Sequence, residues 1–264
     1  HLDEIWGYRD LLWIFVRRDF TTFYKQTILG PLWFFIQPLI STIVYTIIFN
    51  RVAGLPTDGI PPYLFYMSGI IAWSYFSSCL TSTSATFTAN AGIFGKVYFP
   101  RIIVPLSNVV SGLSRFGVQL VMFLGFYFYY RFMGNEQINP SFEILLLLPL
   151  LIILMAMLGM GMGMIVSSLT TKYRDLGFLV NFGTQLLMYA SPIVYPLSIV
   201  PEKYKPFILA NPMTPIIEGF RKAFIGKGQL DLNLFLYSFF FALIIFIIGI
   251  IVFNKVEKDF IDTV

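Results

Sequence analysis

The feature that most constrains the fold is a series of apolar runs, each long enough to cross a lipid bilayer. The first run carries no charged side chain from Leu32 to Asn50. A spanning helix needs about 20 apolar residues to cross roughly 30 Å of hydrocarbon, and it satisfies its own backbone hydrogen bonds. The runs predict an all-α membrane protein, a single transmembrane domain over residues 1–264, with six spans at about residues 31–50, 62–88, 102–130, 142–169, 176–195 and 232–254.

Composition supports this class and argues against catalysis. Hydrophobic residues make up 57% of the chain and charged residues 12%, whereas about a quarter of the residues of a soluble protein are charged. The one cysteine, Cys79, lies in an apolar run and the one histidine is His1, so neither a disulfide framework nor a zinc site is available. The G-x-x-x-x-G-K-[ST] phosphate loop is also missing. We expect no metal, no bound cofactor and no catalytic centre in this chain.

The basic residues predict an orientation in the membrane. Lys and Arg lie before the first run, between the second and third, between the fourth and fifth, and after the sixth, as at Arg17, Lys96, Lys172 and Lys255. Because positively charged flanks stay in the cytoplasm, both termini are expected there. The positive net charge therefore reflects membrane orientation and does not indicate nucleic-acid binding. Carboxylates are nearly absent from the runs, which disfavours proton- or sodium-coupled transport.

Residues 1–29, ahead of the first run, predict an amphipathic helix at the membrane surface. Polar and apolar positions alternate at helical spacing, as expected for a helix in the headgroup layer. Gly30 permits a sharp turn, and Pro31 suits the first turn of the following helix. The cations on this surface helix either hold an anionic head group or only orient the first span, and both readings stay open; they are Arg17, Arg18 and Lys25.

The segment 197–230, before the last run, predicts two short re-entrant helices. Pro201 and Pro215 suit early positions of a helix, and a structureless connection of this length would be unusual. The two helices are expected to dip into the outer leaflet, with their basic residues reaching the outer surface. An outer cap without a gating role is the alternative.

Five motifs, in order and at matching spacing, resemble one family over essentially the whole chain. They are YKQTILGPLWFFIQP (24–38), GKVYFPR (95–101), KYRD (172–175), SPIVYP (191–196) and NPMTPIIEGFR (211–221). Together they are similar to the O-antigen and teichoic acid family of polysaccharide ABC transporter permeases. The resemblance implies a permease homodimer with two separate ATPase subunits, which hold ATP and magnesium. It also implies export of a glycan on an undecaprenyl diphosphate-type lipid to the periplasmic face of the bacterial inner membrane.

The resemblance also implies roles for particular residues. The surface cations would receive the diphosphate. A cytoplasmic turn with exposed aromatic side chains would couple to the ATPase, through Lys96, Val97, Tyr98, Phe99 and Arg101. An outer gate would be formed by Pro192, Tyr195, Pro215, Phe220 and Arg221. For the coupling turn, a simple positively charged membrane anchor is the alternative.

A glycan path needs aromatic faces on which sugar rings stack and hydroxyl groups that border water. The expected wall residues are Trp33, Phe34, Trp73, Phe76, Ser77 and Thr81. Aromatic side chains that merely face lipid are the alternative. A stripe of small residues at Gly159, Gly161 and Gly163 allows close helix approach, which we expect to serve packing within the chain more than a dimer seam.

Three other functions are weighed against polysaccharide export. Within the class, the cargo could be teichoic acid, capsule polysaccharide, a drug or a non-glycan lipid. A membrane glycosyltransferase or acyltransferase would need an acid or histidine pair near the membrane face, which the sequence lacks. A passive channel would not need an aromatic cytoplasmic turn.

Overall fold

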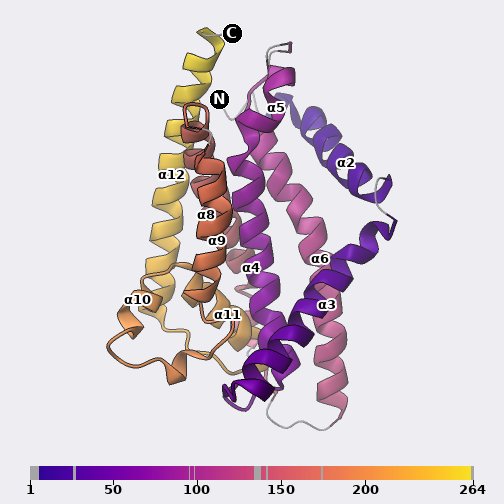
Figure 1. Cartoon of the computed structure of the whole chain (residues 1–264), viewed down its shortest axis with the longest axis vertical. Coiled ribbons are helices and arrows are strands. Elements are labelled where there is room, and N and C mark those ends of the chain that lie inside the picture. The colour runs from indigo at the N-terminus through magenta and orange to yellow at the C-terminus, as the bar shows by residue number, and fades with distance from the viewer. Residues whose placement is uncertain are drawn as a thin grey trace.

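The computed structural model describes residues 6–25, 28–94, 96–97, 99–133, 138–140, 142–173 and 175–262. Within these ranges the chain is helical and contains no strand (Figure 1), which confirms the all-α prediction. The elements are α2 (Arg9–Lys25), the 3-10 turn η1 (Gly30–Leu32), α3 (Trp33–Tyr45), the π-helical η2 (Thr46–Val52), α4 (Pro62–Ser84), α5 (Thr86–Phe94), α6 (Ile103–Phe132), α7 (Phe142–Leu145), α8 (Leu148–Thr170), α9 (Leu176–Tyr189), the 3-10 turn η3 (Leu197–Ile199), α10 (Lys205–Leu209), α11 (Met213–Ile225) and α12 (Leu232–Asp262).

The long helices run along the molecule from one end to the other (Figure 1). The start of α2, α5 and the end of α12 lie at one end, which we call the α5 end. Helices α10 and α11 lie at the other, the α11 end. This is the arrangement expected of a multi-pass membrane protein whose first and last helices reach the same side.

Within the described residues, four helical segments are long and apolar enough to cross a membrane. They are Gly30–Val52, Ile103–Phe132, Leu148–Thr170 and Leu232–Glu257. These segments correspond to the first, third, fourth and sixth predicted spans. The second and fifth are not among the four, so the count of six spans stays a prediction.

Two predicted spans also have different boundaries in the structure. Helix α4 ends at Ser84 and α5 begins at Thr86, so the run to residue 88 is not one continuous helix. Helix α9 ends at Tyr189 instead of residue 195, because Pro192 disfavours a helical conformation for the residue before it. Its 14 residues cover about 21 Å at 1.5 Å per residue, which is shorter than the hydrocarbon layer.

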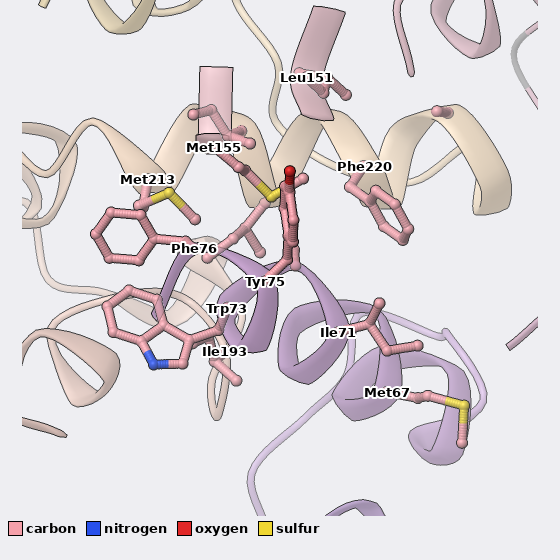
Figure 2. Close-up of a cluster of buried hydrophobic side chains, with 14 of the residues drawn as sticks. Met67, Ile71, Trp73, Tyr75, Phe76, Leu151, Met155, Ile193, Met213 and Phe220 are labelled. Carbon is pink, nitrogen blue, oxygen red and sulfur yellow. The ribbon is translucent and has the colours of Figure 1, made fainter. Parts of the chain in front are cut away.

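Helix α4 occupies the centre of the bundle and contacts α3, α6, α8, α9 and α11. Its aromatic side chains pack into one large apolar cluster, in which Tyr75 and Phe76 of α4 meet Met155 of α8 and Phe220 of α11 (Figure 2). A helix surrounded by protein need not be as apolar as one that faces lipid. The central position therefore accounts for the many serine and threonine residues of α4.

Helix α8 packs between α4 and α12 through glycines that lie on opposite faces. A Cβ atom on Gly159 would lie 2.6 Å from Cβ of Cys79 on α4. A Cβ atom on Gly161 would lie 2.8 Å from Cα of Phe246 on α12. Carbon atoms do not approach this closely without a shift, so the stripe of small residues serves packing within the chain, as expected.

Replacing Gly161 by alanine should destabilise the protein, because the added methyl group meets backbone atoms that cannot rotate away. Overpacking of this kind costs about 1–3 kcal/mol. Thermal unfolding of the purified protein in detergent would measure the effect. Gly125→Ala on α6 is the matched control, since nothing lies within 4 Å of its added Cβ atom. Equal melting temperatures for the two variants would contradict the packing described here.

Candidate functional site

A cavity of about 650 Å³ opens between α3, α4, α6 and α9. Its positions on α4 run from Ile70 to Ser82, roughly 18 Å of helix at 1.5 Å per residue. Hydroxyl, amide and aromatic side chains make up most of the wall. The polar members are Gln37, Ser41, Ser74, Ser77, Ser78, Thr81, Ser82, Arg115, Gln119, Asn181, Thr184 and Gln185.

A second cavity of about 620 Å³ continues from the first toward the α5 end. The two cavities share Thr81 of α4 and Asn181 of α9. Further along, the second cavity is bordered by Thr88 and Thr171. Together they form a path along α4 with a hydroxyl-rich wall, and this path is the candidate functional site.

The polar wall cannot be a lipid-facing surface. The hydroxyl of Ser74 donates to Oε1 of Gln119 at 2.7 Å, which joins α4 to α6. The side chains of Gln37, Asn181 and Gln185 are exposed. An amide in hydrocarbon without a partner costs several kcal/mol, so this side of the chain requires water or another protein surface.

Five of the six side chains predicted for a glycan path lie on the cavity wall: Trp33, Phe34, Trp73, Ser77 and Thr81. Phe76 does not. Its side chain is 2% exposed and is buried with Met155 and Met213 in the core (Figure 2). The sequence places Phe76 on the right helix, but the face that it occupies depends on how α8 and α11 pack against α4.

Arg115 lies on the cavity wall and was given no role from the sequence. Its guanidinium carbon lies 5.4 Å from the ring centre of Phe34 on α3. The carboxylate of Asp19 on α2 also attracts it. A charged residue halfway along an apolar run is itself a signal of function, and that signal would have found Arg115.

At the α11 end of the cavity, a tyrosine connects the two helices on either side of it. The hydroxyl of Tyr45 on α3 donates to Sδ of Met188 on α9 at 3.6 Å. The Tyr45 ring meets Tyr66 of α4 edge-on, with ring centres 6.3 Å apart. The α11 end of the wall is therefore aromatic, whereas the α5 end is rich in hydroxyl groups.

The surface cations belong to α2, and neither Arg17 nor Arg18 lines the cavity. Arg17 is exposed. Arg18 binds the carboxylate of Asp19 at 2.9 Å and lies over the ring of Phe15, 4.8 Å from its centre. The side chain of Lys25 lies outside the described part of the structure.

The predicted coupling turn follows α5 and is only partly as expected. Lys96 and Val97 are exposed, and Tyr98 lies outside the described residues. The expectation of an exposed aromatic side chain at Phe99 is wrong, since Phe99 is 4% exposed. Its ring centre lies 5.7 Å from that of Phe15 on α2 and 5.7 Å from that of Phe94 on α5. Hydrophobic packing at the bundle end outweighs the local polar setting.

Arg101 is likewise a packing residue. Its guanidinium lies over the ring of Phe94 at 5.1 Å, and its backbone N–H donates to Oε1 of Glu257 on α12 at 3.1 Å. Burial lowers the pKa of Arg101 and the charge of Glu257 opposes that effect. The turn is thus tied to α2, α5 and α12.

The predicted outer-gate residues lie at the α11 end, and most are buried. Pro192, Pro215 and Phe220 belong to the interior, and Tyr195 is partly buried. Arg221 does not reach the outer surface as expected for a basic residue there, because its side chain is only 1% exposed. Helix α11 is therefore a core element, and the entry of segment 197–230 into the outer leaflet as two re-entrant helices stays a prediction.

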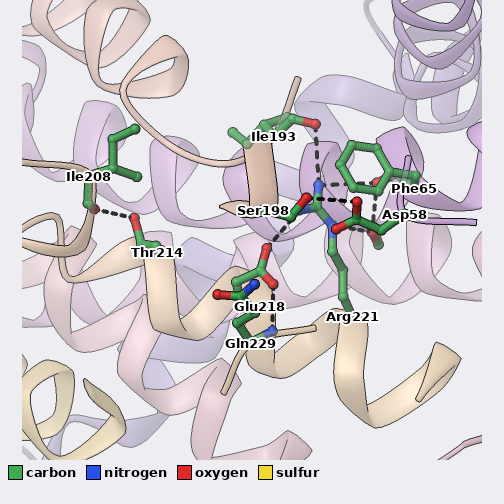
Figure 3. A network of polar contacts seen from close by, with 10 residues as sticks. Asp58, Phe65, Ile193, Ser198, Ile208, Thr214, Glu218, Arg221 and Gln229 are labelled. Atoms are coloured by element: carbon green, nitrogen blue, oxygen red, sulfur yellow. Dashed lines mark hydrogen bonds and ion pairs between the residues drawn. The ribbon is translucent and has the colours of Figure 1, made fainter. Parts of the chain in front are cut away.

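Arg221 stays in the interior because it is surrounded by acceptors (Figure 3). Its Nη1 donates to Oε1 of Glu218 at 3.0 Å. Its Nη2 donates to the carbonyl oxygens of Ile193 at 3.2 Å and of Phe65 at 3.4 Å. The guanidinium also stacks on the Phe65 ring at 3.8 Å. These contacts fasten α11 to the start of α4 and to the turn after α9.

Glu218 is held in turn by the segment that follows α11. The backbone N–H of Gln229 donates to its second carboxylate oxygen at 2.8 Å (Figure 3). Gly226 ends α11 with a φ of 78°, a left-handed conformation that favours glycine. The chain can therefore turn back and deliver this N–H to the carboxylate.

Comparison with known proteins identifies the family to which this chain belongs. The model of the ABC-2 type transporter family matches residues 10–225. The chain belongs to the ABC-2 type transporter family. It is 32% identical over 254 residues to the O-antigen export system permease protein RfbA of Klebsiella pneumoniae, covering 96% of this chain and 94% of that one.

More distant relatives of this ABC-2 chain are also polysaccharide transport proteins by name. RfbA of Myxococcus xanthus is 28% identical over 224 residues, with 84% and 82% of the two chains covered. The polysialic acid transport protein KpsM of Escherichia coli is 24% identical over 250 residues, with 91% of each chain covered. As an ABC-2 permease, the chain is a non-catalytic membrane component, and ATP hydrolysis belongs to a separate subunit. The resemblance stated from the motifs is confirmed.

Breaking the buried ion pair on α11 should destabilise this permease strongly. Arg221→Met leaves the Glu218 carboxylate buried without its guanidinium partner, which costs about 3–5 kcal/mol. Replacing both partners, in Arg221→Met with Glu218→Leu, should recover part of that loss, since no charge is then stranded. Thermal unfolding of the single and double variants would measure the coupling. Additive losses would show that the pair contributes no mutual stabilisation.

Proposed function

We propose that this chain is the membrane subunit of an ATP-driven exporter that carries a lipid-linked polysaccharide, an O-antigen-like glycan on undecaprenyl diphosphate. Transport runs from the cytoplasmic to the periplasmic face of the bacterial inner membrane, with both termini in the cytoplasm. The observation that carries the proposal is the hydroxyl-rich path along α4, in an ABC-2 permease whose relatives are named as polysaccharide exporters.

The wall chemistry suits a sugar polymer. Serine and threonine hydroxyls border water and exchange hydrogen bonds with sugar hydroxyls, and Trp33, which is 45% exposed, offers a ring face for stacking. Trp73 lines the cavity but is only 6% exposed. Several side chains of the wall are exposed. A polymer can slide along such a surface because each contact is weak and easily replaced.

A second copy of the permease completes the path. The exposed amides of Gln37, Asn181 and Gln185 need a polar environment inside the bilayer. Two such walls facing one another across a hydrated space would provide it. The complete transporter is then a homodimer with two ATPase subunits, and ATP and magnesium bind to those subunits.

The turn after α5 transmits the movement of the ATPase. Lys96 and Val97 are available for contact with a partner. Behind them Phe99 packs on Phe15 and Phe94, so a displacement of the turn moves α2 and α5 together.

Arg17, Arg18 and Lys25 attract the diphosphate at the membrane surface. At the α11 end, Pro192, Tyr195, Pro215, Phe220 and Arg221 belong to the gate through which the glycan leaves.

Filling the path should stop export without unfolding the protein. Ser78 lies on the cavity wall and is partly exposed, so Ser78→Trp would obstruct the path while its ring remains in the open space. Surface glycan should fall at least tenfold, and lipid-linked precursor should accumulate in the cytoplasmic leaflet. Ser78→Thr is the control and should export normally. Undiminished export by Ser78→Trp would rule out this wall as the glycan path.

At the coupling turn, two variants distinguish contact with the ATPase from packing inside the permease. Val97→Asp places a charge on an exposed side chain and should uncouple ATP hydrolysis from export with little change in melting temperature. Phe99→Ala removes a buried ring and should instead destabilise the protein by about 3–5 kcal/mol. Co-purification with the ATPase, ATPase activity and thermal unfolding distinguish the two. Normal export by Val97→Asp would contradict the proposed contact.

A further inference from the structure

The wall of the large cavity is polar but nearly uncharged. Among the described residues that line it, Arg115 is the one charged side chain, and the second cavity adds none from the described part of the chain. Arg115 follows the first residue of α6 by twelve positions, which is about 18 Å of helix. It therefore lies deep in the span, where a charge is expensive and usually serves a substrate.

The surroundings of Arg115 come from three elements. Phe34 of α3 lies beneath its guanidinium at 5.4 Å. Asp19 of α2 attracts it electrostatically, and the same carboxylate binds Arg18 at 2.9 Å. The hydroxyl of Ser111, one turn before Arg115 on α6, lies 3.5 Å from the other oxygen of Asp19.

This cluster carries a surplus of positive charge. Its described side chains include the guanidinium groups of Arg18 and Arg115 and the carboxylate of Asp19, which binds Arg18 at 2.9 Å and attracts Arg115 electrostatically. A guanidinium binds phosphate oxygens in a planar, bidentate manner. The cluster is thus suited to a ligand that brings two or more negative charges close together.

The position also suits a ligand that is part lipid and part sugar. The cluster joins α2, α3 and α6, and the exposed Trp33 lines the same cavity as Arg115. An isoprenoid chain would remain against this exposed apolar side chain, while the first sugars enter the hydroxyl-lined path. A diphosphate joins the two parts of such a molecule, and it would then lie at Arg115.

We propose that Arg115 is the binding residue on the cavity wall for the diphosphate of the cargo lipid, and that the attraction of Asp19 for its guanidinium gives way when the diphosphate binds. This inference rests on the proposed function for the identity of the cargo. It extends the proposed capture by Arg17, Arg18 and Lys25 on α2 to a residue of α6, because Arg18 binds the same carboxylate that attracts Arg115. Binding exchanges one anion for another, and no covalent bond changes.

The test measures binding of undecaprenyl diphosphate to the full-length permease in lipid nanodiscs. Arg115→Gln should weaken binding about 10- to 100-fold, the range expected for one lost charge-assisted contact. Arg115→Lys should fall between Arg115→Gln and the unaltered protein, because it keeps the charge and loses the planar fork. Asp19→Asn should bind at least as tightly as the unaltered protein. Arg51→Gln is the matched control, since Arg51 is exposed and does not line the cavity.

A double variant distinguishes ligand binding from a purely structural ion pair. If Arg115 served only to neutralise Asp19, combining Asp19→Asn with Arg115→Gln would restore binding, and the proposal would be overturned. If Arg115 holds the diphosphate, the double variant stays as weak as Arg115→Gln. All variants are first compared for expression and for a single symmetric peak in gel filtration, and Arg115→Lys and Asp19→Asn still decide the question if Arg115→Gln does not fold.

The choice of probe identifies the part of the ligand that is recognised. Undecaprenol, which lacks the phosphates, should bind equally to the unaltered protein and to Arg115→Gln; an equal loss for both lipids would overturn the assignment to the head group. Inorganic diphosphate should displace the lipid diphosphate only where Arg115 is present. Binding of inorganic diphosphate without any binding of the lipid form would overturn the assignment to a lipid-linked cargo.

The same series separates this inference from the proposed function. Full affinity of Arg115→Gln for undecaprenyl diphosphate, in a protein that exports glycan, would refute the role of Arg115 and leave export standing. Loss of affinity as expected, in a transporter that exports no glycan, would refute export and leave the binding residue standing.

Discussion

The close approach of α8 to its two neighbours is the contact on which the rest of the structure depends. Gly159 and Gly161 let the backbones of α4 and α12 come within van der Waals distance of α8 on opposite sides. Three helices held in this way form a closely packed layer. One face of α4 is fixed against α8, and the opposite face is left to serine, threonine and tryptophan side chains that border the cavity. The polar path therefore exists because the apolar packing is concentrated on one side of the central helix.

The sequence predicted the elements that follow from local chemistry. Apolar length located the long helices, and Gly30 with Pro31 located the change from α2 to α3. The wall residues Trp33, Phe34, Trp73, Ser77 and Thr81 were found by combining aromatic and hydroxyl content with the motif resemblance. What could not be predicted depends on which face of a helix meets a neighbour. Phe76 packs with Trp73 in the core, although only Trp73 also borders the cavity. Phe99 is buried although it follows a polar turn.

Arg221 and Arg115 show the same difficulty for charged residues. The segment before α12 was expected to send its basic side chains outward, but Glu218 and the carbonyl groups of Phe65 and Ile193 supply partners that only the folded chain brings together. Arg115 is signalled by its place within an apolar run, and the sequence does not show that Phe34 and Asp19 lie beside it. Whether a charged side chain is buried depends on contacts between residues far apart in the sequence, and the periodicity of the sequence does not reveal these contacts.

The Tyr45 to Met188 contact has a consequence for how the path can change its width. These two residues join α3 to α9, the helices on either side of the cavity, and α9, all of which is described, buries only Thr184. The opposite side of the bundle is locked by the glycine contacts of α8. The packing around α8 is thus tighter than the packing between α3 and α9. Widening of the cavity between these two helices would break a weak bond between a hydroxyl and a sulfur and would loosen the packing of Tyr45, Leu187 and Met188 on the core.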